Sequence, residues 1–344
     1  MAAEFPKKEV LQHLIIAHLQ ANANQAAKHY RMGTIDNPPP SIYHTIRTFW
    51  RDHDMKTILL TGAGGFVGAR IAHHMKDRYQ LITFPKGMLA GADPEAVYAF
   101  AMEHKPYAII HTAAIADIGE CEKDPEASWR ANVLLTVSLC RAAHELDVKA
   151  VCYSSDQVYT GCRPEDGPYR EDIPLSPTNV YARHKLEAEQ RGLSVCPDAV
   201  MLRATWMYDL PGDGLPIRSN LMMNLLEQAK ENRVERFSTT DLRGITYVRQ
   251  VAKWTEQALQ LPGGAYNFGS PNDRNMVETA RAALKALGLP ETLAAADDSR
   301  PARCLAMDPS KLNACGLAFD STQEGFLRCV RQAVTYCKAV ENGI

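Results

Sequence analysis

The chain has 344 residues, of which 46% are hydrophobic and 23% are charged, with 38 Lys and Arg against 40 Asp and Glu. This composition excludes a disordered chain, and the formal net charge of −2 gives no reason to expect a nucleic-acid or anionic-membrane partner. No run approaches the roughly 20 apolar residues that span a bilayer, and the first residues lack the pattern of a secretory signal. The nine dispersed cysteines include no Cys-x-x-Cys pair and no nearby His cluster. They favour reduced thiols in a cytoplasmic protein and predict no metal site.

Residues 1–54 differ in character from the rest of the chain, being rich in Gln, Asn, Ala and His. Leu11, Leu14, Ile15 and Leu19 recur at helical spacing and predict one amphipathic helix in this extension. One interpretation is an arm that binds a partner or a second copy, so a homodimer remains open. The interpretation we favour is an appendage that covers apolar surface and takes no part in chemistry.

From Met55 onward, short apolar runs alternate with helical stretches. Strands are predicted over 56–61, 80–84, 108–112, 150–154 and 199–203. Helices are predicted between and after them, over 69–76, 93–103, 125–146 and 181–191. This order is typical of an α/β protein with a doubly wound parallel sheet, the NAD(P)-binding Rossmann fold.

The pattern also predicts where the domains lie. After the extension at 1–54, we expect the NAD(P)-binding domain at 55–210. Beyond it the pattern is less regular, with helices near 219–231, 276–287 and 321–339. Residues 211–344 are therefore expected to form mainly a smaller α/β substrate-binding lobe, of which about 235–268 returns to the Rossmann domain.

A glycine turn directly follows the first predicted strand and opens a helix. Glycines permit a tight turn and close backbone approach, and the helix start presents free N–H groups to a phosphate. The spacing is Gly-x-x-Gly-x-x-Gly, and taken alone it also fits a turn that binds nothing. The residues expected to contact the cofactor here are Gly62, Gly64, Gly65, Phe66, Val67 and Gly68.

The second predicted strand bears on the choice of cofactor. NAD-selective sites place an Asp or Glu near its end, to bind the ribose hydroxyls. Here the strand ends at Thr83 and Phe84, and the cation Lys86 follows with no carboxylate. Lys86 can pair with a 2′-phosphate, which favours NADP over NAD, although a solvated loop lysine is an equal alternative.

Three residues suggest acid–base chemistry. Tyr181 and Lys185 stand four apart on a predicted helix, which puts phenol and ammonium on one face. A nearby cation is expected to lower the pKa of a phenol. Ser155, at the end of the fourth predicted strand, can hydrogen-bond the substrate oxygen whose proton Tyr181 gives or takes. Lys185 is also expected to hold the nicotinamide ribose.

In this order, these motifs resemble the extended short-chain dehydrogenase/reductase superfamily and, within it, the dTDP-4-dehydrorhamnose reductase family. The resemblance covers about residues 55–335. Its landmarks are Thr61–Gly68, His111–Ala114, Asn132, Ser154–Tyr159, Glu171, Pro177–Tyr181 with Lys185, Leu202–Tyr208, Arg300–Pro301 and Lys311–Leu312.

The resemblance implies that Ser155, Tyr181 and Lys185 form a catalytic triad and that Thr112, Ala113 and Ala114 lie along the cofactor. Family members of this kind use NADPH or NADH to reduce the 4-keto group of a deoxy sugar attached to a nucleoside diphosphate. The expected small-molecule partner is therefore a nucleotide sugar.

The sequence departs from the motifs of related sugar-nucleotide enzymes, and these departures argue against one function but leave others open. Sugar-nucleotide dehydratases carry an Asp-Glu pair after the catalytic hydroxyl residue, whereas this chain has Asp156 and Gln157, and an amide cannot perform the glutamate's acid–base role. Segment 237–246 follows the reductase pattern only loosely, which leaves the sugar open. A nucleotide-sugar epimerase with the same triad is one alternative. Another is a non-catalytic, NADP-binding regulatory subunit like the methionine adenosyltransferase beta subunit, which belongs to the same branch.

A nucleotide-sugar diphosphate needs cationic or amide donors, and several lie in segments expected near the cleft. For each arginine, an ordinary surface or salt-bridged residue is the competing interpretation, and Arg203 is alternatively a structural anchor. Asn132 either bonds backbone near the active site, in support of a water relay with the cofactor, or packs its helix. His184 has a proton-relay role as its less favoured interpretation. The expected substrate residues are Asp156, Arg203, Trp206, Asn220, Arg243 and Arg300, with Arg218 and Arg249 as further candidates.

Overall fold

A computed structural model describes residues 55–85, 87–89 and 93–341. The amphipathic helix expected within residues 1–54 and the residue Lys86 lie outside these ranges. At its centre is a parallel sheet of six strands in the order β10-β5-β4-β3-β1-β2. The strands are β1 (Thr57–Thr61), β2 (Gln80–Thr83), β3 (Ala108–His111), β4 (Lys149–Ser155), β5 (Val200–Ala204) and β10 (Gly264–Phe268).

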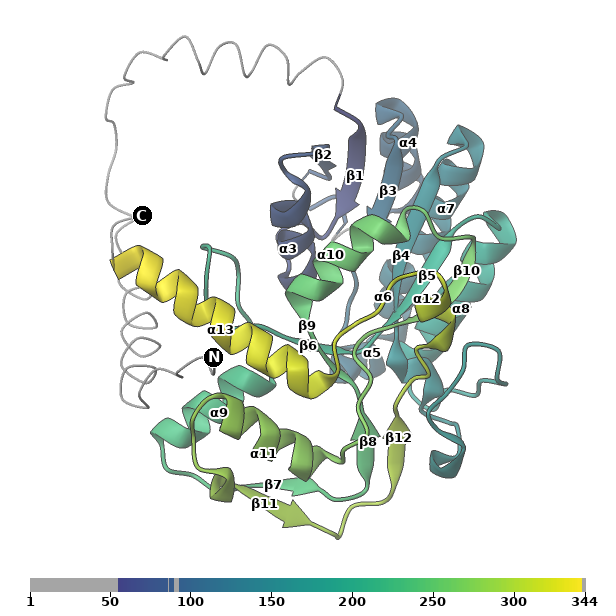
Figure 1. Cartoon of the computed structure of the whole chain (residues 1–344). Coiled ribbons are helices and arrows are strands. Elements are labelled where there is room, and N and C mark those ends of the chain that lie inside the picture. Colours follow the sequence, from purple (N-terminus) through teal and green to yellow (C-terminus); the bar gives the residue numbers. More distant parts are fainter. Residues whose placement is uncertain (1–54, 86, 90–92, 342–344) are drawn as a thin grey trace.

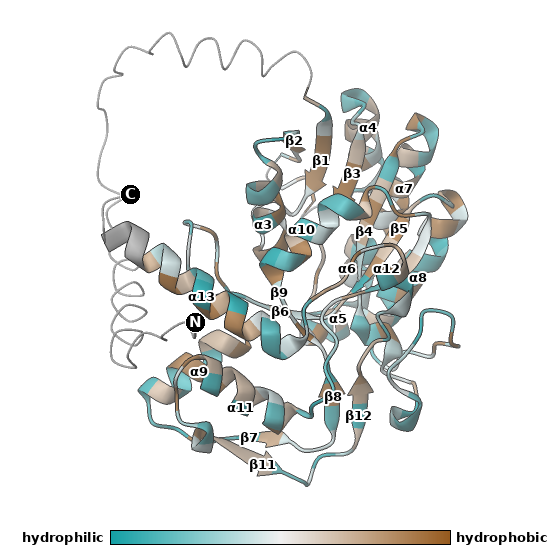
Figure 2. Ribbon diagram, viewed as in Figure 1, coloured by the Kyte–Doolittle hydropathy of each residue, from teal (hydrophilic) through white to brown (hydrophobic). Residues whose placement is uncertain are grey.

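Helices cover both faces of the sheet because its strands are apolar on both sides. On β1, Ile58 and Leu60 pack toward one face and Leu59 toward the other, and all three are fully buried. The first face is covered by α3 (Phe66–Met75) and α10 (Val248–Ala258), and the second by α4 (Pro94–His104), α7 (Leu135–Leu146) and α8 (Val180–Val195). Figure 2 shows hydrophobic strands between helices with hydrophilic outer surfaces. The doubly wound fold predicted from the sequence is confirmed.

The long helix expected over 125–146 is divided. It runs as α6 (Pro125–Trp129), one π-helical segment (Arg130–Leu134) and α7. Before it lies the short α5 (Ile118–Lys123), and both α5 and α6 begin at an aspartate whose side chain accepts a helix N–H. The π-helical turn brings Asn132 beneath the chain segment that leaves β3, to which its side chain is bonded.

A smaller lobe lies at the carboxyl end of the sheet (Figure 1). It has three two-stranded parallel pairs, β6 with β9, β7 with β11 and β8 with β12. Their bounds are β6 (Trp206–Tyr208), β7 (Glu235–Ser238), β8 (Asp241–Arg243), β9 (Ile245–Tyr247), β11 (Ala294–Asp297) and β12 (Arg303–Leu305). Its helices are α9 (Leu221–Lys230), α11 (Met276–Ala286) and α13 (Thr322–Glu341), whereas α12 (Ser310–Ala314) packs against β10 of the large sheet.

The lobe has its own apolar core, in which α9, α11 and α13 bury side chains such as Leu225, Leu284 and Phe326. The chain passes between lobe and sheet more than once. Strands β7 and β8 belong to the small pairs, whereas α10 packs on α3 and β10 joins the edge of the large sheet. Within the described ranges, the structure has no helix long and apolar enough to cross a bilayer.

Candidate active site

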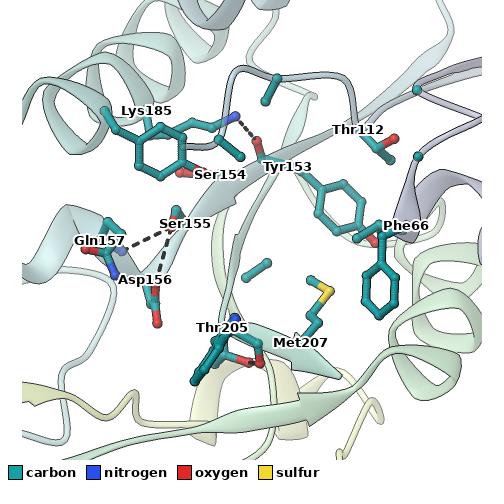
Figure 3. A pocket seen from close by; sticks show the side chains of 18 of the residues that line it. Phe66, Thr112, Tyr153, Ser154, Ser155, Asp156, Gln157, Lys185, Thr205 and Met207 are labelled. Carbon is teal, nitrogen blue, oxygen red and sulfur yellow. Dashed lines mark hydrogen bonds between the residues drawn. The ribbon is translucent and has the colours of Figure 1, made fainter. Parts of the chain in front are cut away.

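A cavity of about 720 Å³ opens where the carboxyl ends of β1, β3, β4 and β5 face the smaller lobe. Strand order reverses between β1 and β3, and ligands of doubly wound sheets bind at such a switch point. Figure 3 shows its side chains converging from both lobes. The lining residues are Gly62, Gly65, Phe66, Val67, Gly68, Thr112, Ala113, Ala114, Ala116, Ile118, Tyr153, Ser154, Ser155, Asp156, Gln157, Tyr181, Lys185, Ala204, Thr205, Trp206, Met207, Arg218, Ser219 and Arg243.

The glycine turn forms one wall of this cavity. Gly62 has a φ of 69°, a conformation that side chains disfavour, and its carbonyl accepts from the Gly65 N–H at 2.8 Å. At Gly68, a Cβ atom would lie 2.1 Å from the Gly62 carbonyl oxygen. Both positions therefore require glycine, so that α3 can start directly against the end of β1.

The start of α3 is open to an anionic ligand. Its first residue follows Gly65, which has no side chain to cap the helix, so the first N–H groups keep their hydrogen-bonding capacity. These N–H groups and the positive end of the helix dipole suit a phosphate. The cradle therefore fits the pyrophosphate of a dinucleotide.

Thr61 joins the ends of β1 and β3 beside this turn. Its hydroxyl accepts from the backbone N–H groups of Thr112 and Ala113, at 3.0 and 3.1 Å, and lies 2.8 Å from His111 Nδ1. The Thr112 hydroxyl donates back to the Thr61 carbonyl at 2.7 Å. These bonds hold the segment after β3 along the cavity. Burial lowers the pKa of His111 to about 3, so its ring is neutral.

Ser155 ends β4 within a small hydrogen-bonded group (Figure 3). Its hydroxyl donates to Asp156 Oδ1 at 3.2 Å and accepts from the Gln157 N–H at 3.2 Å. The other carboxylate oxygen of Asp156 accepts from Arg243 Nη2 at 2.8 Å. Arg243 lies on β8, so this ion pair connects the smaller lobe to the residue that follows Ser155.

Tyr181 and Lys185 lie in the first turns of α8, which Asn179 caps by accepting from the Ala182 N–H at 2.8 Å. Both side chains are buried and line the cavity. The Lys185 ammonium donates to the Tyr153 carbonyl at 2.9 Å and lies 5.8 Å from the centre of the Tyr181 ring.

The pKa of Tyr181 shifts in the direction opposite to the one expected from the sequence, in which a nearby cation lowers it. Burial raises the pKa of Tyr181 to about 12, and its hydrogen bond with Ser155 opposes only part of that rise. Burial lowers the pKa of Lys185 to about 8. Because a phenol with this pKa is protonated at neutral pH, Tyr181 is equipped to give a proton to an oxygen that gains negative charge.

Among the described residues, most of the sequence candidates line the cavity, but Gly64, Asn132, Arg203, Asn220, Arg249 and Arg300 do not. Arg203 does not reach the cavity, because its guanidinium forms a buried ion pair with Glu189 at 2.7 Å and donates to the Tyr159 hydroxyl at 2.8 Å. Its placement corresponds to the alternative of a structural anchor.

Asn220 and Arg300 also fail to fit the expected substrate role. The fully buried Asn220 uses its amide as the cap of α9, accepting from the Met222 N–H at 3.1 Å while donating to the Asp209 carbonyl at 3.1 Å. The guanidinium of Arg300 is exposed and pairs with Asp297 at 2.8 Å. Gly64 lies exposed at the tip of the glycine turn.

Asn132 supports the site from below without lining it. Its side chain accepts from the Ile115 N–H and donates to the Ile115 carbonyl, both at 3.0 Å, and it also donates to Ser128 Oγ at 3.2 Å. These bonds match the first interpretation of Asn132 as a residue that binds backbone near the site. The same Ser128 hydroxyl lies 2.9 Å from His184 Nδ1, so His184 belongs to this supporting group and not to the cavity wall.

Several cavity residues carry little signal in the sequence. Tyr153 follows the alternation of a buried strand, yet its ring lines the cavity and its hydroxyl lies 2.5 Å from Thr255 Oγ1. Thr205 and Met207 flank Trp206 just after β5, and although they lie within the landmark Leu202–Tyr208, no sequence feature assigned either of them a role in the site. Position at or just beyond the carboxyl end of a parallel strand is the signal that could have found all three.

Comparison with known proteins agrees with this geometry. A protein-family model described as the RmlD substrate binding domain matches residues 55–315. A dTDP-4-dehydrorhamnose reductase of Mycolicibacterium smegmatis is 30% identical over 183 residues, which are 51% of this chain and 55% of that protein. The methionine adenosyltransferase 2 subunit beta of Xenopus tropicalis is 29% identical over 249 residues, which are 68% of this chain and 73% of that protein.

A solved structure extends the likeness to the fold. The dTDP-4-dehydrorhamnose reductase from Bacillus anthracis, crystallised in complex with NADP, superposes with a TM-score of 0.73. The match covers 82% of this chain and 99% of that one, at 20% sequence identity.

Proposed function

Because the chain belongs to the RmlD substrate-binding domain family, whose model matches residues 55–315, we propose that it is an NAD(P)-dependent reductase of a nucleotide-linked 4-keto sugar. The observation that carries the proposal is the cavity itself, where an uncapped glycine turn and the buried set of Ser155, Tyr181 and Lys185 face one space. The likeness to a dTDP-4-dehydrorhamnose reductase supports the same class of reaction.

The bound cofactor supplies the hydride, and the residues of this chain bind and protonate the sugar. The N-terminal turn of α3 would hold the pyrophosphate of the cofactor, and the segment from Thr112 to Ala114 would line its binding site. Ser155 positions the keto oxygen by a hydrogen bond, and Tyr181 donates its proton to that oxygen as negative charge develops. When Tyr181 has given its proton, the Lys185 ammonium stabilises the resulting Tyr181 phenolate.

NADP is the cofactor we propose. The complex of the Bacillus anthracis structure with NADP supports this choice. Within the described part of β2 and the loop after it, Thr83, Phe84 and Pro85 offer no carboxylate for a ribose hydroxyl. The contribution of Lys86 stays a prediction from the sequence.

The substrate diphosphate is proposed to lie beside Arg218 and Arg243. Arg218 lines the cavity, stacks 5.1 Å from the centre of the Phe66 ring and forms no ion pair with a carboxylate of the described residues. Its positive charge therefore remains available to a phosphate. Arg243, in contrast, already neutralises Asp156.

A second candidate is a non-catalytic regulatory subunit, and one specific observation favours it. The likeness to a methionine adenosyltransferase beta subunit covers more of this chain than the likeness to the Mycolicibacterium reductase. The buried triad argues for catalysis, because a buried lysine is costly to keep without a function.

The test is oxidation of NADPH by the purified protein with a panel of nucleotide-linked 4-keto sugars. We expect turnover with at least one sugar, and Tyr181→Phe should lower it by about 10²- to 10⁴-fold while NADPH still binds. Tyr98→Phe, which changes a tyrosine bonded to Glu145 outside the cavity, is the matched control and should leave turnover unchanged.

Other outcomes identify the alternatives. Binding of NADPH without turnover of any sugar would reject the reductase and support the regulatory subunit. An epimerase would retain NAD during purification and interconvert sugars without net use of cofactor.

A further inference from the structure

Arg218 reaches the active-site cavity from the loop of residues 209–220, which connects β6 to α9. Its guanidinium lies 5.1 Å from the centre of the Phe66 ring, which borders the same cavity (Figure 3). The charge of Arg218 opposes part of the rise in the pKa of Tyr181, so guanidinium and phenol face one space. A loop arginine loses conformational entropy when a ligand fixes its side chain. Contacts that already hold Arg218 over the cavity therefore favour ligand binding.

Hydrogen bonds fix the backbone of this loop at and before Arg218. The Pro216 carbonyl accepts from Arg70 Nη1 at 2.7 Å, and the Arg218 carbonyl accepts from the buried Asn220 amide at 3.0 Å. The same amide donates to the Asp209 carbonyl at 3.1 Å. The Asp209 carboxylate in turn accepts from Arg70 Nε at 2.7 Å. Both ends of the loop and the backbone of Arg218 thus belong to one hydrogen-bonded group.

Arg70 connects this group to the start of α3, the proposed cofactor cradle. Its side chain is buried, so it acts through its neighbours and not on a ligand. The nitrogen that binds the Pro216 carbonyl also donates to the Phe66 carbonyl at 2.9 Å. The guanidinium carbon of Arg70 lies 4.1 Å from the centre of the Phe66 ring, so this ring is within cation–π distance of both arginines.

We propose that Arg70 is a positioning residue that holds Arg218 in place for the diphosphate of the nucleotide sugar. It acts through two contacts, the Pro216 carbonyl and the Phe66 ring. The inference rests on the proposed function, which supplies the diphosphate. A planar guanidinium directs donors to a carboxylate and two carbonyls at once, which a lysine ammonium cannot reproduce. Arg70→Lys therefore keeps the charge beside Asp209 but loses the geometry.

The test is a double-mutant cycle on nucleoside diphosphate binding, because a residue that acts through Arg218 loses its effect once Arg218 is replaced. Calorimetry measures the binding of dTDP, UDP and GDP to protein saturated with NADP⁺, which closes the cofactor site to these probes. The cycle uses the probe that binds the wild type most tightly. We expect Arg218→Gln to weaken its binding at least tenfold and Arg70→Lys about fivefold. In the Arg218→Gln background, Arg70→Lys should weaken it less than twofold.

Phe66→Leu tests the second contact and leaves the pair of Arg70 and Asp209 in place. It should weaken binding about fivefold in the wild type and less than twofold in the Arg218→Gln background. This variant decides the question if Arg70→Lys fails to fold, which circular dichroism of each variant shows.

Arg78→Lys is the matched control. Like Arg70, Arg78 donates to the carbonyl four residues earlier, that of His74, at 2.8 Å, and to a carboxylate, that of Glu256, at 2.8 Å. None of these three residues lines the active-site cavity. The control should therefore bind the probe as the wild type does.

The pattern across the cycle decides the outcome. Equal losses from Arg70→Lys in both backgrounds would overturn the proposal, because Arg70 would then act on the fold as a whole. Wild-type affinity in Arg218→Gln, or in both Arg70→Lys and Phe66→Leu, would overturn it too, as would the absence of probe binding to the wild type. Sugar turnover is measured separately. A protein that shows the coupling without turnover would keep the positioning role and lose the proposed reductase activity.

Discussion

Tyr181 and Lys185 illustrate how burial decides the chemistry of a single residue. Their spacing suggests that the ammonium lowers the phenol pKa, but burial opposes charge on both groups and raises the pKa of Tyr181 to about 12 while lowering that of Lys185 to about 8. The pair thus holds a protonated phenol beside an ammonium that is lost under mildly alkaline conditions. Such an arrangement suits reduction, in which the phenol gives its proton.

The lowered pKa of Lys185 predicts the pH dependence of activity. Protonated Lys185 predominates below about pH 8 and neutral Lys185 above it, so kcat/KM for reduction should fall as the pH rises through about 8. Arginine stays charged, and Lys185→Arg, although slower, should move this fall to higher pH. A profile from pH 6 to 10 measures it. An unchanged falling limb in Lys185→Arg would show that another group titrates.

At the scale of elements, the junction of β1 and α3 depends on backbone proximity. The two ends of the glycine turn can approach each other because Gly68 has no Cβ atom, which would clash with the Gly62 carbonyl oxygen. Gly64, in the same turn, has no atom within 4 Å of the position its Cβ would take. The two glycines therefore have opposite tolerance for a side chain.

Gly68→Ala should disturb the cofactor site while Gly64→Ala should not. Overpacking costs about 1–3 kcal/mol, so we expect a lower Tm and a Kd for NADPH that rises about tenfold in Gly68→Ala. Fluorescence titration with NADPH measures the affinity. Equal affinities in the two variants would mean that the close approach of Gly68 to Gly62 does not shape the site.

The ion pair of Arg203 and Glu189 joins β5 to α8 within the core. The two side chains are 5% and 3% exposed, and Glu189 also accepts from the Ser154 hydroxyl. Ser154 precedes the catalytic candidate Ser155, and Glu189 follows Lys185 by one helical turn. The pair thus holds the strand and helix that carry the proposed triad.

Arg203→Met should be strongly destabilising because it leaves the Glu189 carboxylate buried without a partner. We expect a loss of about 3–5 kcal/mol in the free energy of unfolding, measured with urea. The double variant Arg203→Met with Glu189→Leu should recover much of that loss. Arg141→Met removes an exposed pair with Glu145 and should have a far smaller effect. If the double variant recovers nothing, packing rather than the unpaired charge explains the loss.

At the scale of the whole molecule, the active-site cavity exists only where the two lobes meet. The ion pair between Asp156 and Arg243 crosses that boundary, and the two side chains are 3% and 13% exposed. It joins the end of β4 to β8 and thereby couples the orientation of Ser155 to the position of the smaller lobe. Neither residue of this pair belongs to the glycine turn or to α3, which form the proposed cofactor cradle.

Arg243→Gln should therefore affect the sugar and spare the cofactor. We expect the KM for the sugar to rise about tenfold, with the Kd for NADPH unchanged. Arg300→Gln alters another arginine of the same lobe, whose partner is Asp297, and should change neither constant. Steady-state kinetics and NADPH titration measure both. A rise in the Kd for NADPH alone would contradict the placement of Arg243 on the substrate side.

Elements that depend on local patterns could be predicted well. The strand expected over 108–112 is β3 at Ala108–His111, and the helix expected over 276–287 is α11 at Met276–Ala286. The π-helical turn at Arg130–Leu134 could not be predicted, because the neighbours that Asn132 binds come from the loop after β3. The small parallel pairs were missed for the same reason, since β7 finds its partner β11 far along the chain.

The sequence by itself determined the doubly wound fold, the glycine turn and the spacing of Tyr181 and Lys185, because each follows from residues close together in the chain. Only the tertiary structure decided which polar residues reach the cavity. Arg203 and Arg243 look alike in the sequence, yet one is enclosed beside Glu189 and the other faces Asp156 at the cavity wall. The burial of a side chain and its charge partner depend on segments that folding brings together, so they cannot be predicted from the residues next to it in the sequence.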